Sequence, residues 1–535
     1  MEFRHHNTDI TLINVPYQSE GGQVMKPLGL CYLASFLVSK GFSVVGLDFS
    51  YSKLSPGQLV DKFKLYDFPI VGLSFYNINA AVAYQIAQEI KSINPSVIIV
   101  AGGPHVSALY DTLFKSHPEM DIVVKNEGEL TTEELIVAIK EKSDLREVKG
   151  ISYHIKGEIF VNEPRERISN LDQIPAPTFK FETDNEPEEH FFYDSISGEL
   201  KLATALVTSR SCPYNCSFCA IILIGRQWRK CSPLKIVDDL TRVETVDAKR
   251  YNHIYFLDAN FFVSVKRTVE VAKELRRYNP KITFSFSTRA NQLIKGKEYI
   301  RELADLGLRA VEVGIESGSD KALIRYAKDT TVEQNYEAIR LLQDNGIQLF
   351  LDFIMFDAET DIDDLEKNII FLENSNLDTY VPWSHLFSYM TPYLGTGIRK
   401  RYESILDRKF DEDYLPTPES LFLNHQVKQI FMELNKFKPT IRYLKDILNL
   451  FESNIQTEKF TYELARLKLN YLEIRRIPFV IFKKLIFQAK NGDEINIETV
   501  LPVFYTNTGK KIPLKEFLTL FKKEIIKFNN QYELA

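Results

Sequence analysis

Short apolar runs alternate with helical patterns through the first 125 residues, and this alternation restricts the fold more than any other feature of the sequence. The helical stretches include Leu28–Lys40 and Ala80–Ser92. Strands separated by helices in this way are typical of βαβ units and of a parallel sheet. The strand candidates are Asp9–Val15, Phe42–Asp48, Ile70–Phe75, Val97–Ala101 and Ile122–Lys125. We therefore expect an α/β fold that begins with a doubly wound parallel sheet. Its ligand crevice should lie at the carboxyl ends of the strands, in the loops at 16–22, 49–55, 76–79, 102–107 and 126–129.

A second α/β series starts at Leu202. Its strand candidates are Thr204–Thr208, His253–Leu257, Ile282–Ser287, Ala310–Glu316 and Leu349–Phe356, with a sixth at Val381–Ser388. Helical patterns at 233–243, 269–278, 297–306, 332–345 and 362–375 separate them. Six such units over about 190 residues predict a partial (βα)₆ barrel of the TIM type, with its catalytic groups in the loops at the carboxyl ends of the strands.

The remaining segments complete the expected domain organisation. Residues 150–162 predict a β-hairpin that turns at Lys156-Gly157, and the prolines and acidic residues up to 200 (including Pro187 and Glu182–Glu189) indicate a linker. From about Arg399 the pattern is helical, for example at 460–470 and 517–528. The expected domains are a Rossmann-like sheet at 1–149, a hairpin and linker at 150–200, the barrel at 201–398, and a mostly helical C-terminal domain at 399–535.

Composition narrows the class of protein. The chain has 535 residues, a net charge of −6 and a pI near 6.0, so we expect no nucleic-acid partner. The start MEFRHHNTDI does not resemble a signal peptide, and no run of 18 apolar residues occurs, so we expect a cytoplasmic protein without a membrane partner. Five cysteines are too few for a disulfide scaffold, yet three of them fall within eight residues.

Those three cysteines, Cys212, Cys216 and Cys219, stand in SRSCPYNCSFCA with the spacing C-x₃-C-x₂-C, directly after the first barrel strand. Three thiolates this close can hold three irons of a cubane. Because iron–sulfur clusters are normally held by four thiolates, the fourth iron would lack a protein ligand. A small molecule with an amine and a carboxylate, such as S-adenosylmethionine (SAM), can chelate that iron. Phe218 would shield the cluster from water.

A zinc site is the main structural alternative, with Cys231 as a distant fourth ligand. No second close pair of ligands follows the motif, which disfavours zinc. Cys231 and Cys31 are most simply small buried apolar residues.

The spacing and position of the cysteines resemble the signature of the radical SAM superfamily. The resemblance continues at the ends of later strands, in FLDANF, FSTRA and GIESGS. It implies that Glu316 and its neighbours contact the ribose or methionyl part of SAM, and that Ser287 and Arg289 bind its carboxylate and ribose. The residues implied at the SAM site are Phe218, Asp258, Asn260, Ser287, Arg289, Gly314, Glu316 and Ser317. Structural roles stay open: Asp258 and Glu316 would cap helices, and Arg289 would form an ion pair. At the end of the fifth strand, Phe356-Asp357-Ala358 departs from the Gly-Pro turn of many such proteins. His385 would face the substrate or be a buried structural histidine.

The sheet and barrel together resemble the cobalamin (B12)-binding radical SAM proteins over roughly residues 9–395. Motifs that carry this resemblance are Pro27–Leu30, Asp48, Ala101–Ser107, Asn126–Glu129 and Ile174–Phe179. Gly102 and Gly103 let the backbone approach a flat macrocycle, and the absence of G-x-G-x-x-G disfavours a dinucleotide. The residues implied at the cobalamin site are Pro16, Asp48, Ser74, Tyr76, Gly102, Gly103, His105, Asn126, Glu127 and Gly128. The D-x-H-x-x-G motif that supplies a lower cobalt ligand is missing, so we do not assign that role to His105. Loss of the corrin, with the domain kept as a scaffold, is the alternative.

The resemblance implies the reaction as well. A 5′-deoxyadenosyl radical would take a hydrogen atom from an unactivated carbon of a small-molecule or peptide intermediate, and the carbon would then be methylated. An external one-electron reductant is the expected partner. Oxidative cyclisation or rearrangement without methyl transfer is the alternative reaction. A tRNA methylthiotransferase would need a further cysteine-bound cluster. A non-catalytic metal-binding scaffold would not cleave SAM.

Overall fold

The computed structural model describes residues 8–16, 26–184, 189–379, 383–412, 415–454, 462–505 and 510–532. The chain divides into two compact units. The first comprises residues 1–313, 341–350 and 392–415, and the second comprises residues 314–340, 351–391 and 416–535.

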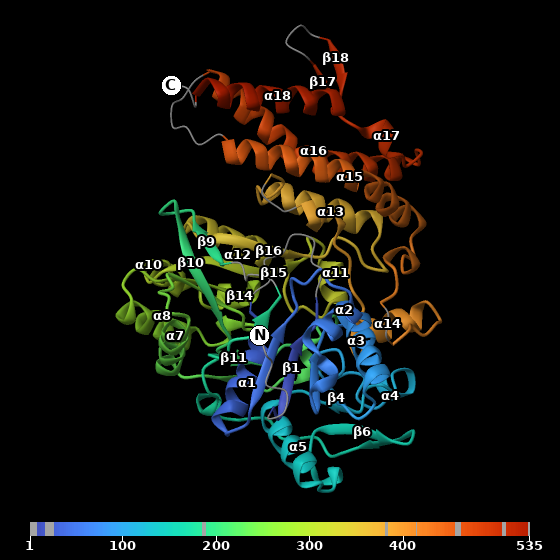
Figure 1. Ribbon diagram of the computed structural model, residues 1–535. Coiled ribbons are helices and arrows are strands. Elements are labelled where there is room, and N and C mark those ends of the chain that lie inside the picture. The colour runs from blue at the N-terminus through green and yellow to red at the C-terminus, as the bar shows by residue number, and fades with distance from the viewer. Residues whose placement is uncertain are drawn as a thin grey trace. The chain divides into compact units, whose positions relative to one another are not determined.

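An eight-stranded sheet begins the first unit, with the order β7-β6-β5-β4-β3-β1-β2-β8; its strands run from blue to teal in Figure 1. Its strands are β1 (Ile10–Asn14), β2 (Val44–Asp48), β3 (Ile70–Ser74), β4 (Ile98–Gly102), β5 (Ile122–Val124), β6 (Ile151–Ile155), β7 (Glu158–Val161) and β8 (Glu182–Thr183). Strands β1 to β5 and β8 pair in parallel, and β6 and β7 are antiparallel. The predicted parallel sheet is therefore confirmed.

Helices cover both faces of this sheet because its strands are apolar on both sides. The helices are α1 (Leu28–Ser39), α2 (Pro56–Phe63), α3 (Ala80–Ile93), α4 (Leu113–Ser116) and α5 (Glu129–Glu141). Ile13 and Leu73 pack with residues of α2 and α3, whereas Ile10 and Leu12 pack with residues of α1 and α5. The two separate cores confirm the doubly wound arrangement.

The segment expected as a linker contributes to both sheets, which corrects the prediction for residues 163–200. Strand β8 pairs with β2, and β9 (Phe191–Asp194) pairs antiparallel with β10 (Glu199–Leu206). A Cβ at Gly46 would lie 2.7 Å from the Phe179 ring and 2.9 Å from the Phe181 ring. This glycine therefore lets two linker aromatics rest directly on β2. The predicted hairpin at 150–162 is confirmed as β6 and β7, at the edge of the first sheet. Pro187 lies outside the described residues.

The second sheet has six strands in the order β16-β15-β14-β13-β10-β9. After β10 come β13 (His253–Phe256), β14 (Thr283–Arg289), β15 (Leu308–Glu316) and β16 (Gln348–Phe353). Strands β10, β13 and β14 are parallel, as a partial barrel requires. The helices among and after these strands are α6 (Ile221–Ile224), α7 (Pro233–Asp247), α8 (Val265–Tyr278), α9 (Ala290–Lys295), α10 (Ile300–Asp305), α11 (Asp320–Arg325), α12 (Val332–Asp344), α13 (Ile362–Asn374) and α14 (Gly397–Ile405).

The sixth predicted barrel strand, Val381–Ser388, is wrong. Residues Trp383–Phe387 form a 3-10 helix, and Val381 lies outside the described residues. The Trp383 indole donates a hydrogen bond of 2.9 Å to the Arg475 carbonyl, a tertiary contact that fixes this segment in a non-extended form.

The C-terminal part is mostly helical, as predicted. It contains α15 (His425–Asn454), α16 (Tyr462–Asn491), α17 (Ile497–Val500) and α18 (Leu514–Tyr532), with a small hairpin of β17 (Val503–Tyr505) and β18 (Lys511–Pro513). Aromatic rings join three of these helices: Phe451 of α15 stacks on Tyr471 of α16 at 4.6 Å and on Phe521 of α18 at 6.2 Å. Among the described helices, none combines the length and apolarity needed to cross a bilayer.

Candidate active site

The three clustered cysteines lie in a loop that a two-stranded ribbon closes. Strand β11 (Ser209–Arg210) pairs antiparallel with β12 (Arg229–Lys230), and the cysteines occupy the chain between them. Cys216 is buried, and Cys212 and Cys219 are half-buried. None of the five cysteines forms a disulfide. The cysteine motif therefore stands on a loop anchored at both ends.

Asp258, directly after β13, fixes the start of this loop. Its carboxylate accepts hydrogen bonds from the Thr208 amide at 2.6 Å, the Thr208 hydroxyl at 2.8 Å and the Ser209 hydroxyl at 2.6 Å. Burial raises the pKa of Asp258 despite these hydrogen bonds. Since both carboxylate oxygens are engaged, the geometry favours a role in holding the loop. The predicted SAM contact of Asp258 stays a prediction.

Arg289, at the end of β14, reaches the cysteine loop directly. Its Nη1 lies 2.8 Å from Cys216 Sγ, and its guanidinium lies 4.0 Å from the centre of the Tyr214 ring. The Gln292 amide donates a hydrogen bond to the Tyr214 hydroxyl, which holds that ring in place. Arg289 thus faces the sulfur of Cys216, and its predicted SAM contact stays a prediction.

Two buried N–H donors beside the cysteines lack a partner among the described residues. They are Arg289 Nη2 and Asn260 Nδ2. Asn260 Oδ1 accepts a hydrogen bond of 3.0 Å from Thr288, so the amide orientation is fixed. Burial raises the pKa of Cys212, whereas Tyr214, Arg289 and Asn260 lower it. Buried donors are rarely left unpaired, so these two fit an anionic sulfur cluster or a carboxylate ligand at the loop.

A mononuclear metal site is less well supported. Across the described ranges, no three His, Cys, Asp or Glu side chains converge as metal ligands, and this holds for the three clustered cysteines as well. Burial raises the pKa of the Cys231 thiol to about 12, which disfavours the thiolate that zinc would need. Burial also raises the pKa of Cys31 to about 12. Both cysteines fit the interpretation as small buried residues.

Other predicted SAM residues of the first unit have structural contacts. The Ser287 hydroxyl donates a hydrogen bond to Glu312. Phe218 is half-buried within the cysteine loop. The hydrogen bond of Ser287 and the burial of Phe218 do not test the SAM contacts that the resemblance implies.

Gly314, Glu316 and Ser317 belong to the second unit and form a buried group there. Glu316 has a positive φ of 65° and accepts a hydrogen bond of 2.5 Å from Lys328, which is also buried. A Cβ at Gly314 would lie 2.6 Å from Lys328 Nζ and 2.7 Å from Glu316 Oε1. Glycine at 314 therefore leaves room for this ion pair. Ser317 donates a hydrogen bond of 2.7 Å to Asn368. Spacing alone could not reveal Lys328 as the partner of Glu316.

His385, considered for the substrate side, forms a hydrogen bond of 2.5 Å with the Leu351 carbonyl. This contact supports the structural interpretation.

The predicted cobalamin loops at 49–55, 76–79, 102–107 and 126–129 follow strands β2 to β5 of the first sheet, whereas residues 17–22 of the first predicted loop lie outside the described residues. The nearest heavy atom to a Cβ placed on Gly102 would be the Leu73 carbonyl oxygen at 4.0 Å, so open space lies above β4. Gly103 has φ of 103°, and its Cβ would lie 2.6 Å from the Phe75 carbonyl oxygen, so backbone packing requires this glycine. Tyr76, which follows β3, is 58% exposed and offers an apolar face at the same edge. An open glycine edge with an exposed ring fits a flat macrocycle.

His105 is buried and engaged within the domain. Its Nδ1 lies 3.4 Å from the Asn77 amide and its Nε2 lies 3.2 Å from the Tyr84 hydroxyl. Burial lowers the pKa of His105 to about 4. Both ring nitrogens therefore have polar partners within the domain, and the expected place of His105 at the cobalamin site stays a prediction.

The end of β2 is ordered by Asp48, which accepts hydrogen bonds from Asn14 at 2.8 Å and from the Ser50 hydroxyl at 2.5 Å. Pro16 is buried and Ser74 is half-buried. Asp48 also lines a cavity of about 310 Å³ in the first unit, together with residues of α1, the linker and β10. The other residues predicted to contact cobalamin are not in its lining.

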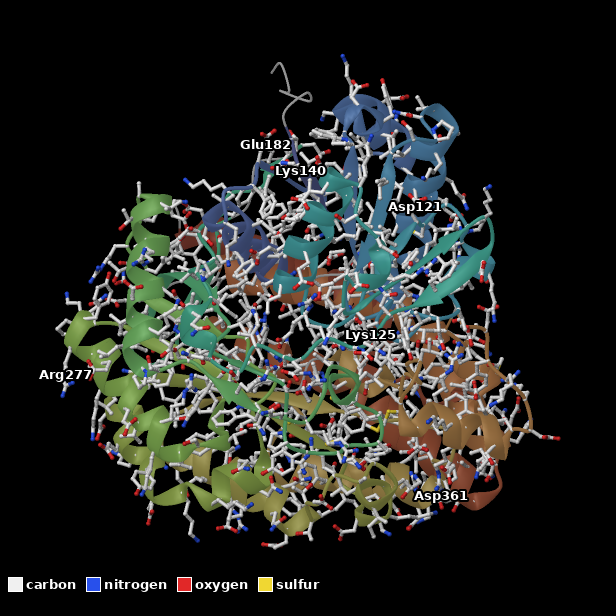
Figure 2. All side chains as sticks on the ribbon, turned by 90° about the horizontal axis from the view of Figure 1, so that it is seen from below. Asp121, Lys125, Lys140, Glu182, Arg277 and Asp361 are labelled. Carbon is white, nitrogen blue, oxygen red and sulfur yellow. The ribbon has the colours of Figure 1, made fainter. Side chains whose placement is uncertain are left out.

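The turn after β5 forms an ion pair that the sequence did not predict. Lys125, labelled in Figure 2, leads into it with its ammonium 3.2 Å from the centre of the Tyr110 ring. Asn126 has φ of 65°, and its Oδ1 has no partner among the described residues. Gly128 precedes α5. Glu127 pairs with Arg229 of the cysteine-loop ribbon at 2.6 Å. The carboxylate predicted to contact cobalamin thus joins the sheet domain to the cysteine loop.

Family models match both the sheet domain and the barrel. The family model described as the B12 binding domain matches residues 17–136, and that of the Radical SAM superfamily matches residues 206–372. The uncharacterized methyltransferase PH0819 of Pyrococcus horikoshii is 30% identical over 70% of this chain and 78% of its own length. The anaerobic magnesium-protoporphyrin IX monomethyl ester cyclase of Rubrivivax gelatinosus is 25% identical over 95% of this chain and 93% of its own.

Solved structures of one enzyme match nearly the whole chain. Among them is the cobalamin-dependent S-adenosylmethionine radical enzyme OxsB with aqua-cobalamin and S-adenosylmethionine bound. The match has a TM-score of 0.73 at 21% identity and covers 98% of this chain and 79% of OxsB. At this identity the likeness establishes the shared fold.

Proposed function

Because the chain belongs to the radical SAM enzymes that carry a B12-binding domain, we propose that it methylates an unactivated carbon of a small-molecule or peptide intermediate. It would do so with a [4Fe–4S] cluster, SAM and cobalamin. The relative from P. horikoshii, named a methyltransferase, supports this choice of reaction.

The observation that carries the proposal is the pair of unpaired buried N–H groups beside the three cysteines. Cys212, Cys216 and Cys219 would hold the cluster. Arg289 and Asn260 would direct their free N–H groups at the cluster or at the carboxylate of SAM. When bound, the cluster supplies the electron that cleaves SAM, and cobalamin carries the methyl group.

We assign substrate recognition to the helical C-terminal domain at 399–535. This part of the chain lies outside both family-model matches, so it is where substrate-specific sequence is expected. An external one-electron reductant would supply the electron.

Oxidative cyclisation without methyl transfer is a second candidate. The relative named as a cyclase supports it, because that protein matches 95% of this chain, including the C-terminal helices.

The test uses the full-length protein, reconstituted anaerobically with iron, sulfide and hydroxocobalamin. After reduction with dithionite in the presence of SAM, mass spectrometry measures 5′-deoxyadenosine and S-adenosylhomocysteine. Methyl transfer predicts both products, because SAM would also give its methyl group to the reduced cobalamin and leave as S-adenosylhomocysteine, whereas cyclisation predicts 5′-deoxyadenosine alone.

The matched variants are Cys216→Ala and Cys231→Ala. The first should abolish both products, and the second should retain them, because only Cys216 belongs to the proposed cluster site. If the wild-type protein forms neither product, the proposed function is refuted.

A further inference from the structure

Four charged side chains join the B12-binding sheet to the base of the cysteine loop. Glu127 and Glu129 come from the turn after β5 and the start of α5, and Arg210 and Arg229 come from the ribbon β11–β12 that closes the loop. The side chains are only 4% to 18% exposed. We call these four residues the charged joint. Charges this far from water are costly unless each is closely paired.

The two ion pairs of the charged joint have a defined geometry. Arg229 forms a two-pronged contact with Glu127, with Nη1 at 3.0 Å and Nη2 at 2.6 Å from the two carboxylate oxygens. Arg210 Nη2 lies 2.5 Å from Glu129 Oε1. A two-pronged contact fixes orientation as well as distance, so the turn and the ribbon hold a defined geometry.

The charged joint also reaches the cluster site. Arg210 precedes Cys212 by two residues, and Arg229 Nη2 lies 3.3 Å from the Ser211 hydroxyl. At the other end of the charged joint, Glu127 directly follows Asn126 in the turn that is expected to contact cobalamin. The same two domains are also joined by Lys26 and Asp247 at 2.7 Å, and half of the Lys26 side chain is exposed. Adhesion between the domains therefore does not by itself require the buried joint.

We propose that the charged joint couples the two cofactor sites. When the cluster orders the cysteine loop, Arg210 and Arg229 hold Glu127 and Glu129, and with them the cobalamin turn, in the binding geometry. The four are positioning residues, and cluster loading changes the affinity for cobalamin through them. By linkage, cobalamin changes the stability of the bound cluster by the same factor. The inference rests on the proposed function, because it needs both cofactors.

The experiment measures the Kd of hydroxocobalamin by equilibrium dialysis of the full-length protein. Each variant is measured with its cluster reconstituted and after removal of iron with a chelator. The readout is the ratio of the two Kd values of each variant. A substitution that removes a direct cobalamin contact changes both Kd values equally, so this effect cancels in the ratio.

Arg229→Lys keeps the charge but loses the two-pronged geometry, and Glu127→Gln removes the charge. Arg210→Lys tests the second pair independently, in case the Arg229 variant does not take up iron. The matched control is Arg165→Lys, because Arg165 forms a two-pronged pair with Glu134 of the same domain but does not reach the ribbon.

In the wild-type protein, cluster loading should change the cobalamin Kd by at least about five-fold. The ratio should fall below about two-fold in the joint variants and stay at the wild-type value in Arg165→Lys. Joint variants that keep the wild-type ratio, or a control that loses it equally, would overturn the inference.

The wild-type protein separates this inference from the proposed function. If it binds both cofactors with an unchanged Kd, the coupling is overturned and the proposed function stands. If it binds no cobalamin or no cluster, the proposed function fails and the coupling fails with it.

Discussion

Asp258 is the residue on which the conformation of the cysteine loop most depends. Asp258→Asn replaces one acceptor oxygen by an N–H₂ group that faces buried donors. We expect a loss of about 1–3 kcal/mol in the free energy of unfolding, because buried donors lose their acceptor. We also expect less iron per chain after anaerobic reconstitution, measured by iron analysis.

The control is Asp238→Asn on α7, where the carboxylate is about half exposed and pairs with Arg242. It should keep the wild-type iron content. Equal iron in Asp258→Asn and the wild-type protein would contradict the proposed role of Asp258.

His253 on β13 makes the stability of the first unit dependent on pH. Its ring is buried between Thr283 at 2.9 Å and Ser285 at 3.0 Å, and burial lowers its pKa from 6.5 to about 3. Below pH 6.5 the unfolded chain binds a proton that the folded protein does not. The neutral His253 ring therefore makes its full contribution to the free energy of unfolding above pH 6.5. About 3 kcal/mol of this free energy is lost when the pH falls to about 4.

His253→Gln keeps hydrogen-bonding groups but does not titrate, so its stability should fall less with acid. Urea unfolding followed by circular dichroism at several pH values measures this difference. Replacement of the exposed His425 by Gln should leave the wild-type profile unchanged. Parallel wild-type and His253→Gln profiles would show that His253 is not the cause.

Single residues of the site differ in how far the sequence could predict them. The grouping of Cys212, Cys216 and Cys219 in one loop is predictable because the three stand within eight residues of the sequence. The contacts of Asp258 with Thr208 and of Glu127 with Arg229 join residues 50 and 102 positions apart. One sequence contains no local signal for such pairs, because they arise only when strands and turns pack.

At the scale of elements, Arg325 joins α11 to the chain that leads into α13. Its Nη2 lies 2.7 Å from Asp357 and 3.1 Å from Asp364, and both carboxylates are buried. Arg325→Met would leave two buried carboxylates without their cation. We expect a loss of about 3–5 kcal/mol, measured by chemical unfolding.

The control is Arg277→Met on α8. Arg277 lies at the periphery in Figure 2, and its side chain is 72% exposed beside Glu274. This variant should change stability by less than about 1 kcal/mol. Similar losses in the two variants would contradict the distinction between the buried and the exposed pair.

Elements with strong apolar periodicity were predictable, and those set by tertiary contacts were not. Strands β1 to β5 follow apolar runs that are buried on both faces, so their sequence identifies them. Strands β8 and β9 are short, and each is defined by the neighbour with which it pairs. The apolar segment at 383–387 became a 3-10 helix, where Trp383 contacts Arg475, 92 residues later in the chain.

At the scale of the whole molecule, the first unit combines the doubly wound sheet with the cysteine loop and strands β10, β13 and β14 of the half-barrel. The charged joint links them at the loop that would carry the cluster. This architecture puts the cysteines expected to hold the cluster and the loops expected to contact cobalamin in the same unit.

The most direct test is iron analysis and electron paramagnetic resonance of the anaerobically reconstituted, reduced protein with and without SAM. We expect about four irons per chain, in one cluster whose spectrum changes when SAM is added, and loss of that signal in Cys216→Ala. A bound zinc ion, or a cluster whose spectrum does not respond to SAM, would contradict a three-cysteine cluster with one iron open to SAM.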